Sequence, residues 1–92
     1  MNIIQGDVVL ATAGKEKGKL FIAWKVDERY CYLVDGKRLK IVKPKKKSLK
    51  HIHKASKISF PEKFLCEKEE KVNAEIRKFL KERKNYVETR CH

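Results

Sequence analysis

The stretch GDVVLATAGKEKGKLFIAWKV, residues 6–26, decides the fold. Residues 7–12 are apolar and β-branched and predict a first strand, and residues 19–26 predict a second. Between them, residues 13–18 hold two glycines among lysines and predict a loop. Apolar side chains fall on both faces of the second strand, as expected when one face lies in a core and the other beneath another element. The stretch therefore predicts a strand–loop–strand unit that opens a β domain.

Further short strands are predicted after this unit. Residues 30–34 (YCYLV) predict a third strand and residues 38–42 (RLKIV) a fourth. The dipeptide Asp35-Gly36 between them favours the positive φ angles of a tight hairpin turn, and Pro44 is expected to end the fourth strand because it cannot donate to a ladder. Residues 49–52 are a candidate fifth strand. Five short strands indicate a small barrel, closed or nearly closed, because closure removes exposed edges.

The second part of the chain changes to a helical period. Ser59 and Glu62 fit a capping box, in which a hydroxyl and a carboxylate satisfy free amides, and proline is tolerated in a first turn. An apolar stripe then runs to about residue 84, made of Leu65, Val72, Ile76, Phe79 and Leu80. We predict a barrel over residues 1–58, a helix over residues 59–85 that docks on the barrel, and a flexible tail over residues 86–92.

The charge of the chain is concentrated in the predicted barrel. The sequence has 24 Lys and Arg against 12 Asp and Glu, a formal net charge of +12. Between residues 37 and 57 there are ten basic residues and no acidic one, with two histidines added. Such a block repels itself unless a polyanion neutralises it. We therefore favour a polyanion-binding role over a lysine-rich face that only aids solubility, with nucleic acid as the default polyanion.

Residues 6–26 resemble the KOW motif, a strand–loop–strand unit of ribosomal proteins and transcription elongation factors whose loop has the form G-x-x-x-G, here GKEKG at residues 14–18. A longer match combines GKL at residues 18–20, an apolar strand, VDG at residues 34–36 and a basic strand. It is similar to the eukaryotic and archaeal type of large-subunit ribosomal protein fourteen and to short bacterial KOW-domain proteins. Phe21 stands where many KOW motifs have glycine, a departure that favours the ribosomal branch. The resemblance covers residues 6–52 and implies an SH3-like barrel that binds structured RNA, typically ribosomal RNA.

The resemblance also implies a phosphate-contacting site in the loop, where backbone amides and flanking lysines meet phosphate oxygens: Gly14, Lys15, Lys17, Gly18 and Lys19. The charge pattern adds a second basic surface near the predicted hairpin and along residues 43–54: Lys37, Arg38, Lys40, Lys43, Lys45, Lys46, Lys47, Lys50, His51, His53 and Lys54. If the barrel closes, we expect the two surfaces to join in one basic face. Because lysine outnumbers arginine, recognition of RNA shape through the backbone is favoured over reading of base edges.

Single features support other functions less well. Tyr30 and Tyr32 share one strand face and could stack on unpaired bases, but a half-buried strand face also needs large amphipathic side chains, and we favour that role. With Trp24 they could form a cage for methylated lysine, which the surrounding positive charge disfavours. His51 and His53 would suit a metal pair if extended, but no CxxC or second ligand pair accompanies them, and we predict no metal site.

No enzymatic activity and no cofactor are predicted, because the serines and the three cysteines lack a recognisable base and orienting acid. The chain is expected to be cytoplasmic, without a membrane role and monomeric when free. Its predicted partner is RNA, above all ribosomal RNA of the large subunit, with ribosomal proteins as additional candidates. The alternative from another class is a protein–protein adaptor in translation or transcription. Its interface would be the apolar helix face of residues 65–80.

Overall fold

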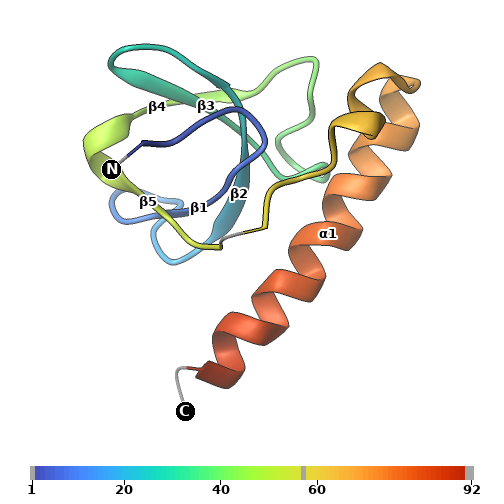
Figure 1. Ribbon diagram of the computed structural model, residues 1–92. Helices are drawn as coiled ribbons and strands as arrows, with labels where there is room; N and C mark the ends of the chain where they lie inside the picture. Colours follow the sequence, from blue (N-terminus) through green and yellow to red (C-terminus); the bar gives the residue numbers. More distant parts are fainter. Residues whose placement is uncertain (1, 57, 91–92) are drawn as a thin grey trace.

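The computed structural model describes residues 2–56 and 58–90 (Figure 1). Its elements in chain order are β1 (Val8–Ala11), β2 (Leu20–Val26), β3 (Tyr30–Val34), β4 (Lys45–Ser48), the 3₁₀ turn η1 (Leu49–His51), β5 (Ile52–Lys54), the 3₁₀ turn η2 (Glu62–Cys66) and α1 (Glu69–Arg90). The predicted fold class, mainly β with one C-terminal helix, is confirmed: the chain forms a curled five-stranded antiparallel sheet followed by a helix.

The strands form one antiparallel sheet in the order β4-β3-β2-β1-β5, and η1 joins the two edge strands. Alternate residues of a strand point to opposite faces, so each face of the sheet has its own apolar cluster. The inner cluster lies inside the curled sheet and contains Val9, Ala11, Phe21, Ala23, Cys31, Leu33 and Ile52. The outer cluster lies between the sheet and α1 and contains Val8, Ile22, Val34, Phe60, Val72, Ile76 and Leu80.

Helix α1 packs along the outer face of the sheet, chiefly against β2 (Figure 1). Its buried residues Val72, Ile76 and Leu80 recur every four positions, so the predicted apolar stripe faces the sheet there. The helix continues through Arg90, past the predicted end at residue 85, and residues 91–92 of the predicted tail lie outside the described residues. Among the described residues, no helix combines the length and the apolar character needed to span a membrane.

The predicted start of the helix at Ser59 is wrong, because α1 begins at Glu69. The Ser59 hydroxyl donates a hydrogen bond to Asp7 Oδ1 at 2.9 Å instead of capping a helix. Phe60 is buried, and its ring centroid lies 5.6 Å from that of Phe64 and 5.6 Å from that of Phe79. The segment before α1 is therefore an extended connection anchored by Ser59 and Phe60, followed by η2.

The predicted fourth strand at residues 38–42 is also wrong. Residues 35–44 form the β3–β4 loop, and β4 pairs with β3 over residues 45–48. The spacing of Leu39 and Ile41 imitates one face of a strand, but Leu39 packs against the inner cluster and Ile41 against the outer one. Two anchors of one loop thus produced the pattern of a strand.

The remaining strand predictions need smaller corrections. Pro44 directly precedes β4 rather than ending a strand, a position where its missing amide breaks no ladder bond. Of the predicted fifth strand, residues 49–51 form η1, and pairing with β1 begins at Ile52 opposite Ala11. The sequence thus predicts a fifth strand near the right place but three residues too early.

Gly36 is the point where the β3–β4 loop touches α1. Its φ is +75°, and a Cβ at this position would lie only 2.2 Å from the Asn73 carbonyl oxygen. The buried Asn73 accepts a hydrogen bond from the Ile41 amide through Oδ1 at 3.1 Å, and Arg77 Nη1 donates to the Gly36 carbonyl. The loop therefore fits against the helix because glycine has no side chain and permits this conformation.

Candidate nucleic-acid interface

Two loops at one end of the sheet carry most of the exposed basic side chains of the barrel. Turns of an antiparallel meander alternate between its ends, so the β1–β2 loop (residues 12–19) and the β3–β4 loop share one end, here called the basic end. Within the described part of the chain, its exposed basic residues form no ion pairs, and their charges are free to meet an anion. They are Lys15, Lys17, Lys19, Lys37, Arg38, Lys40 and Lys43.

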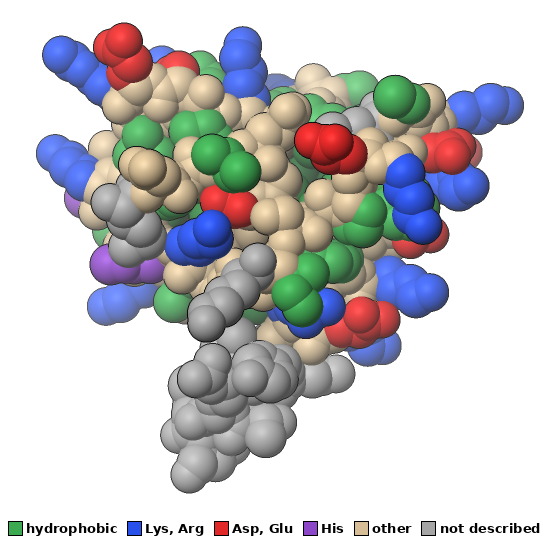
Figure 2. Space-filling view, in the orientation of Figure 1, with side chains coloured by type: hydrophobic (Ala, Val, Ile, Leu, Met, Phe, Trp, Pro, Cys, Tyr) green, Lys and Arg blue, Asp and Glu red, His purple; other side chains and the backbone are tan. Residues whose placement is uncertain are grey.

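The opposite end of the sheet has a different charge. There the β2–β3 turn exposes Asp27 and Glu28 beside Arg29, and Figure 2 shows acidic side chains at the upper left, where Figure 1 places this turn. Hydrogen bonds from the amides of Tyr30 and Arg29 hold the pKa of Asp27 below its usual range. The barrel is therefore polarised, and a polyanion is attracted to the basic end.

The β1–β2 loop has a fixed shape because its backbone groups bond to one another. The Lys17 amide donates to the Gly14 carbonyl at 3.2 Å, and the Gly18 amide donates to the Ala11 carbonyl at 2.9 Å. Gly14 and Gly18 have φ values of +78° and +85°, which other residues rarely adopt. The loop thus holds Lys15, Lys17 and Lys19 in defined positions at the surface.

The β3–β4 loop is shaped by Asp35. Its Oδ1 accepts hydrogen bonds from the Lys37 amide at 2.9 Å and the Leu39 amide at 2.8 Å. Leu39 and Ile41 turn inward to the two apolar clusters. The basic residues of this loop are consequently presented outward on a backbone that is anchored at both faces of the sheet.

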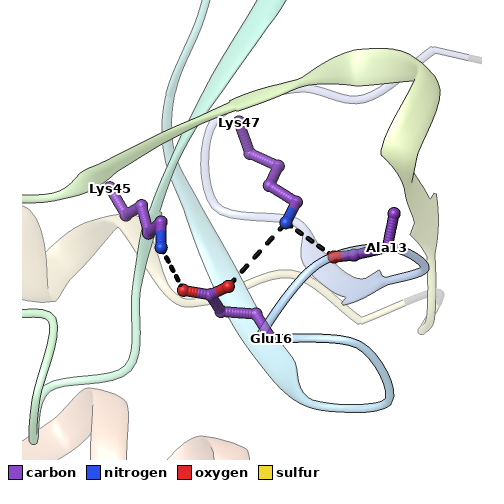
Figure 3. A network of polar contacts seen from close by, with 4 residues as sticks. All are labelled: Ala13, Glu16, Lys45 and Lys47. Carbon is purple, nitrogen blue, oxygen red and sulfur yellow. Dashed lines mark hydrogen bonds and ion pairs between the residues drawn. The ribbon is translucent and has the colours of Figure 1, made fainter.

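Glu16 joins the β1–β2 loop to β4, as Figure 3 shows. It forms a salt bridge with Lys45, while Lys47 Nζ lies 3.8 Å from Glu16 Oε2 and donates to the Ala13 carbonyl at 2.6 Å. The hydrogen bond from Lys45, aided by the charge of Lys47, holds the pKa of Glu16 below its usual range. We call this set of contacts the Glu16 clasp. It ties the β1–β2 loop to β4.

The clasp gives the three consecutive predicted lysines, Lys45, Lys46 and Lys47, different roles. The Lys47 side chain is only 12% exposed and is committed to the clasp, whereas the Lys45 side chain is 42% exposed. Lys46 lies on the opposite side of β4, with its ammonium 4.1 Å from the ring centroid of Tyr30. Of the three consecutive lysines, Lys47 is therefore a structural contact.

The other predicted residues lie along η1 and β5. Lys50 and His53 are exposed and His51 is half-buried, and the His51 carbonyl accepts a hydrogen bond from the Thr12 amide at 2.8 Å, next to the β1–β2 loop. Figure 2 shows histidine beside basic side chains at the left edge of the molecule. Lys54 is 3.7 Å from the buried Asp7 carboxylate. His51 thus lies beside the basic end, whereas η1 begins next to the β2–β3 turn, where the Leu49 amide donates to the Arg29 carbonyl at 2.9 Å. Lys54 has a structural contact with Asp7.

The geometry gives little support to a metal site or to a nucleophilic cysteine. His51 belongs to η1 and His53 to β5, and among the described residues no group of three His, Cys, Asp or Glu is placed to hold a metal. Burial, with the charges of Asp7 and Asp27, raises the pKa of the Cys31 thiol to about 12, which makes it a poor nucleophile.

The methyl-lysine cage is opposed by the arrangement of its predicted residues. Trp24 packs against the outer cluster. Lys25 Nζ lies 5.7 Å from the ring centroid of Tyr32 and Lys46 covers Tyr30. The tyrosines already have cations of the protein over their rings, which repel a cationic ligand.

Sequence reasoning missed Glu16 as a part of the interface and identified Asp35 only as a turn residue. Glu16 is the single acid between Asp7 and Asp27 in the sequence, and an isolated acid in a lysine loop could have indicated an internal ion pair.

No known family model matches the sequence, and no curated protein is significantly similar to it.

Proposed function

We propose that the protein binds structured RNA, ribosomal RNA in particular, by contacting its phosphate backbone at the basic end. The observation that carries this proposal is the group of seven exposed basic side chains, without ion pairs in the described part of the chain, on two anchored loops of one end. Their positive charge is of the kind that releases counterions from nucleic acid and drives its binding.

The mechanism is electrostatic and involves no chemical reaction. Six of the seven side chains are lysines, whose ammonium is a point charge on a flexible stem and makes phosphate contacts without reading base edges. The loops are held by the Glu16 clasp and by Asp35 before RNA arrives. Because the loop backbones are already ordered, RNA binding costs less conformational entropy than it would with disordered loops.

The adaptor alternative has weaker support. It requires the apolar face of the helix, but Val72, Ile76 and Leu80 on that face are buried against the sheet. A partner that used these side chains would have to displace the helix from the outer cluster.

Charge reversal of the β1–β2 loop tests RNA binding. The triple variant Lys15→Glu, Lys17→Glu, Lys19→Glu should bind a folded ribosomal RNA fragment about 10- to 100-fold more weakly than the wild type, because three phosphate contacts are lost. The matched control changes three exposed lysines of the helical region to Glu: Lys68, Lys78 and Lys81. It alters net charge equally and should retain most of the affinity. An equal loss in both variants, measured by fluorescence anisotropy, would contradict binding at the basic end.

Association with the ribosome, which the KOW resemblance suggests, has its own test. The protein in cell lysate is sedimented through a gradient at low and high salt, with and without RNase. Migration with the large subunit at low salt supports the ribosomal part of the proposal. A protein that stays at the top of the gradient at low salt would contradict it.

A further inference from the structure

We infer that the outer face of β3 binds unpaired RNA bases by stacking on Tyr30 and Tyr32, so that the bound RNA includes single-stranded nucleotides beside the folded part. This inference rests on the proposed RNA binding and specifies its ligand. It concerns a surface separate from the two loops of the basic end.

The strand register gathers aromatic and basic side chains on this face. Tyr32 lies opposite Lys25 of β2 and Lys46 of β4, and Tyr30 lies opposite Ser48. Directly paired residues in an antiparallel sheet project to the same side. Two tyrosines and two lysines from three strands therefore form one patch, here called the tyrosine patch.

Helix α1 covers one part of the outer face and leaves the tyrosine patch open. Val34, on the same face of β3, is buried in the cluster under the helix. Tyr30 is 37% exposed and Tyr32 is half-buried. In Figure 1 the helix runs on the right of the sheet, away from the β2–β3 turn next to which Tyr30 begins its strand. The patch is thus a sheet surface that the chain's own helix does not cover.

The lysines show that the tyrosine rings present their faces to the surface. Lys46 Nζ is 4.1 Å from the Tyr30 centroid, and Lys25 Nζ is 5.7 Å from the Tyr32 centroid. Exposed cation–π contacts are weaker than base stacking on an aromatic ring. A base can therefore replace the ammonium over the ring, and the flexible lysine stem allows the ammonium to reach the adjoining phosphate.

Strand β4 connects the tyrosine patch to the basic end. Lys46 belongs to the patch, while its neighbours Lys45 and Lys47 point to the other side and bind Glu16. On the outer face of β4, an RNA whose folded part contacts the loops meets the ammonium of Lys46 beside Tyr30. The ammonium groups of Lys25 and Lys46 outnumber the neighbouring carboxylate of Asp27, which accepts from the Tyr30 amide at 2.8 Å. With the stackable rings, they identify a polyanion with free bases as the occupant.

The test compares RNA probes that differ only in free bases. One is a hairpin with a short single-stranded extension, the second has abasic sites throughout the extension, and the third is the blunt hairpin. Wild-type protein should bind the first about 5- to 100-fold more tightly than the abasic probe. Equal affinity for these two probes would overturn the inference without any variant.

Variants of Tyr30 locate the effect. Tyr30→Leu should reduce the preference for the base-containing extension by the contribution of one ring, about 5-fold or more, and keep its affinity for the blunt hairpin. The matched control Tyr30→Phe, which retains the ring, should keep both. A Tyr30→Leu protein that remains folded by circular dichroism and keeps the full preference would overturn the inference. If blunt-hairpin binding still depends on the loop lysines, the proposed function stands. Absence of wild-type binding to every probe would overturn both.

Discussion

Replacing Gly36 with alanine is expected to separate α1 from the barrel. The new Cβ would lie 2.2 Å from the Asn73 carbonyl oxygen, against 3.4 Å for an ordinary contact, so loop and helix must part by about 1.2 Å. This movement weakens the Ile41–Asn73 and Arg77–Gly36 hydrogen bonds, at about 1 kcal/mol each. The left-handed backbone adds about 1–2 kcal/mol. With some loss of packing under the helix, the free energy of unfolding should fall by about 3–5 kcal/mol.

Gly18→Ala is the matched control for this experiment. Gly18 has a similar φ of +85°, but a Cβ there meets nothing within 4 Å. Gly18→Ala should lower the free energy of unfolding only through the left-handed backbone, by about 1–2 kcal/mol. Urea unfolding followed by far-UV circular dichroism measures both variants, and Gly36→Ala should have a midpoint lower by about 1–2 M than that of Gly18→Ala. Equal midpoints would refute the close contact between the β3–β4 loop and α1.

Three further predictions concern the clasp, the helix and the cysteines. Glu16→Gln should lower the free energy of unfolding at pH 7 by about 1 kcal/mol. Because the folded pKa of Glu16 is lowered, the difference from wild type should be full above the ordinary Glu value of about 4.3 and vanish as the pH falls through the folded pKa; a pH-independent difference in urea midpoints would contradict the clasp. Ile76→Ala should cost about 2–5 kcal/mol in the same assay, because Ile76 is fully buried under the helix, and a cost below about 1 kcal/mol would indicate an undocked helix. In peptide-level alkylation at pH 8, the exposed Cys66 should react rapidly and the buried Cys31, with its pKa raised to about 12, only after unfolding; rapid labelling of Cys31 in the folded protein would refute its burial.

The first three strands were predictable because local patterning specifies them. Residues 7–12, 19–26 and 30–34 combine β-branched and aromatic residues with turn signals on both sides, and each contains an observed strand. The stripe of Val72, Ile76 and Leu80 likewise predicted the helix face that packs on the sheet. In these segments local propensity and burial favour the same structure.

Strand β4 was not predictable in the same way, because it has no apolar residue. Its sequence is KKKS, and it is a strand because its backbone pairs with β3. Its lysines also have tertiary contacts: Lys45 and Lys47 with Glu16, and Lys46 with Tyr30. The more apolar residues 38–42 were chosen instead, although they form a loop. Pairing between distant segments thus overrode local propensity.

The candidate site was predictable in composition but less so in arrangement. Charge counting identified every exposed lysine of the two loops. These loops share one end because the turns of an antiparallel meander alternate between its ends. Charge counting could not separate Lys47, which is bound within the clasp, from Lys15 or Lys17, because that difference depends on the distance from Glu16. Sequence reasoning also could not show that Tyr30 lies on an open face of the sheet, because this depends on the position at which α1 packs.

The dependence of RNA affinity on salt tests the central claim most directly. If the seven exposed basic residues of the basic end meet phosphates, the logarithm of the binding constant should fall against the logarithm of salt concentration with a slope of about −5 to −6. The triple variant Lys15→Glu, Lys17→Glu, Lys19→Glu should reduce the magnitude of that slope by about 3. A wild-type slope near zero, or a slope that the variant leaves unchanged, would contradict phosphate binding at the basic end.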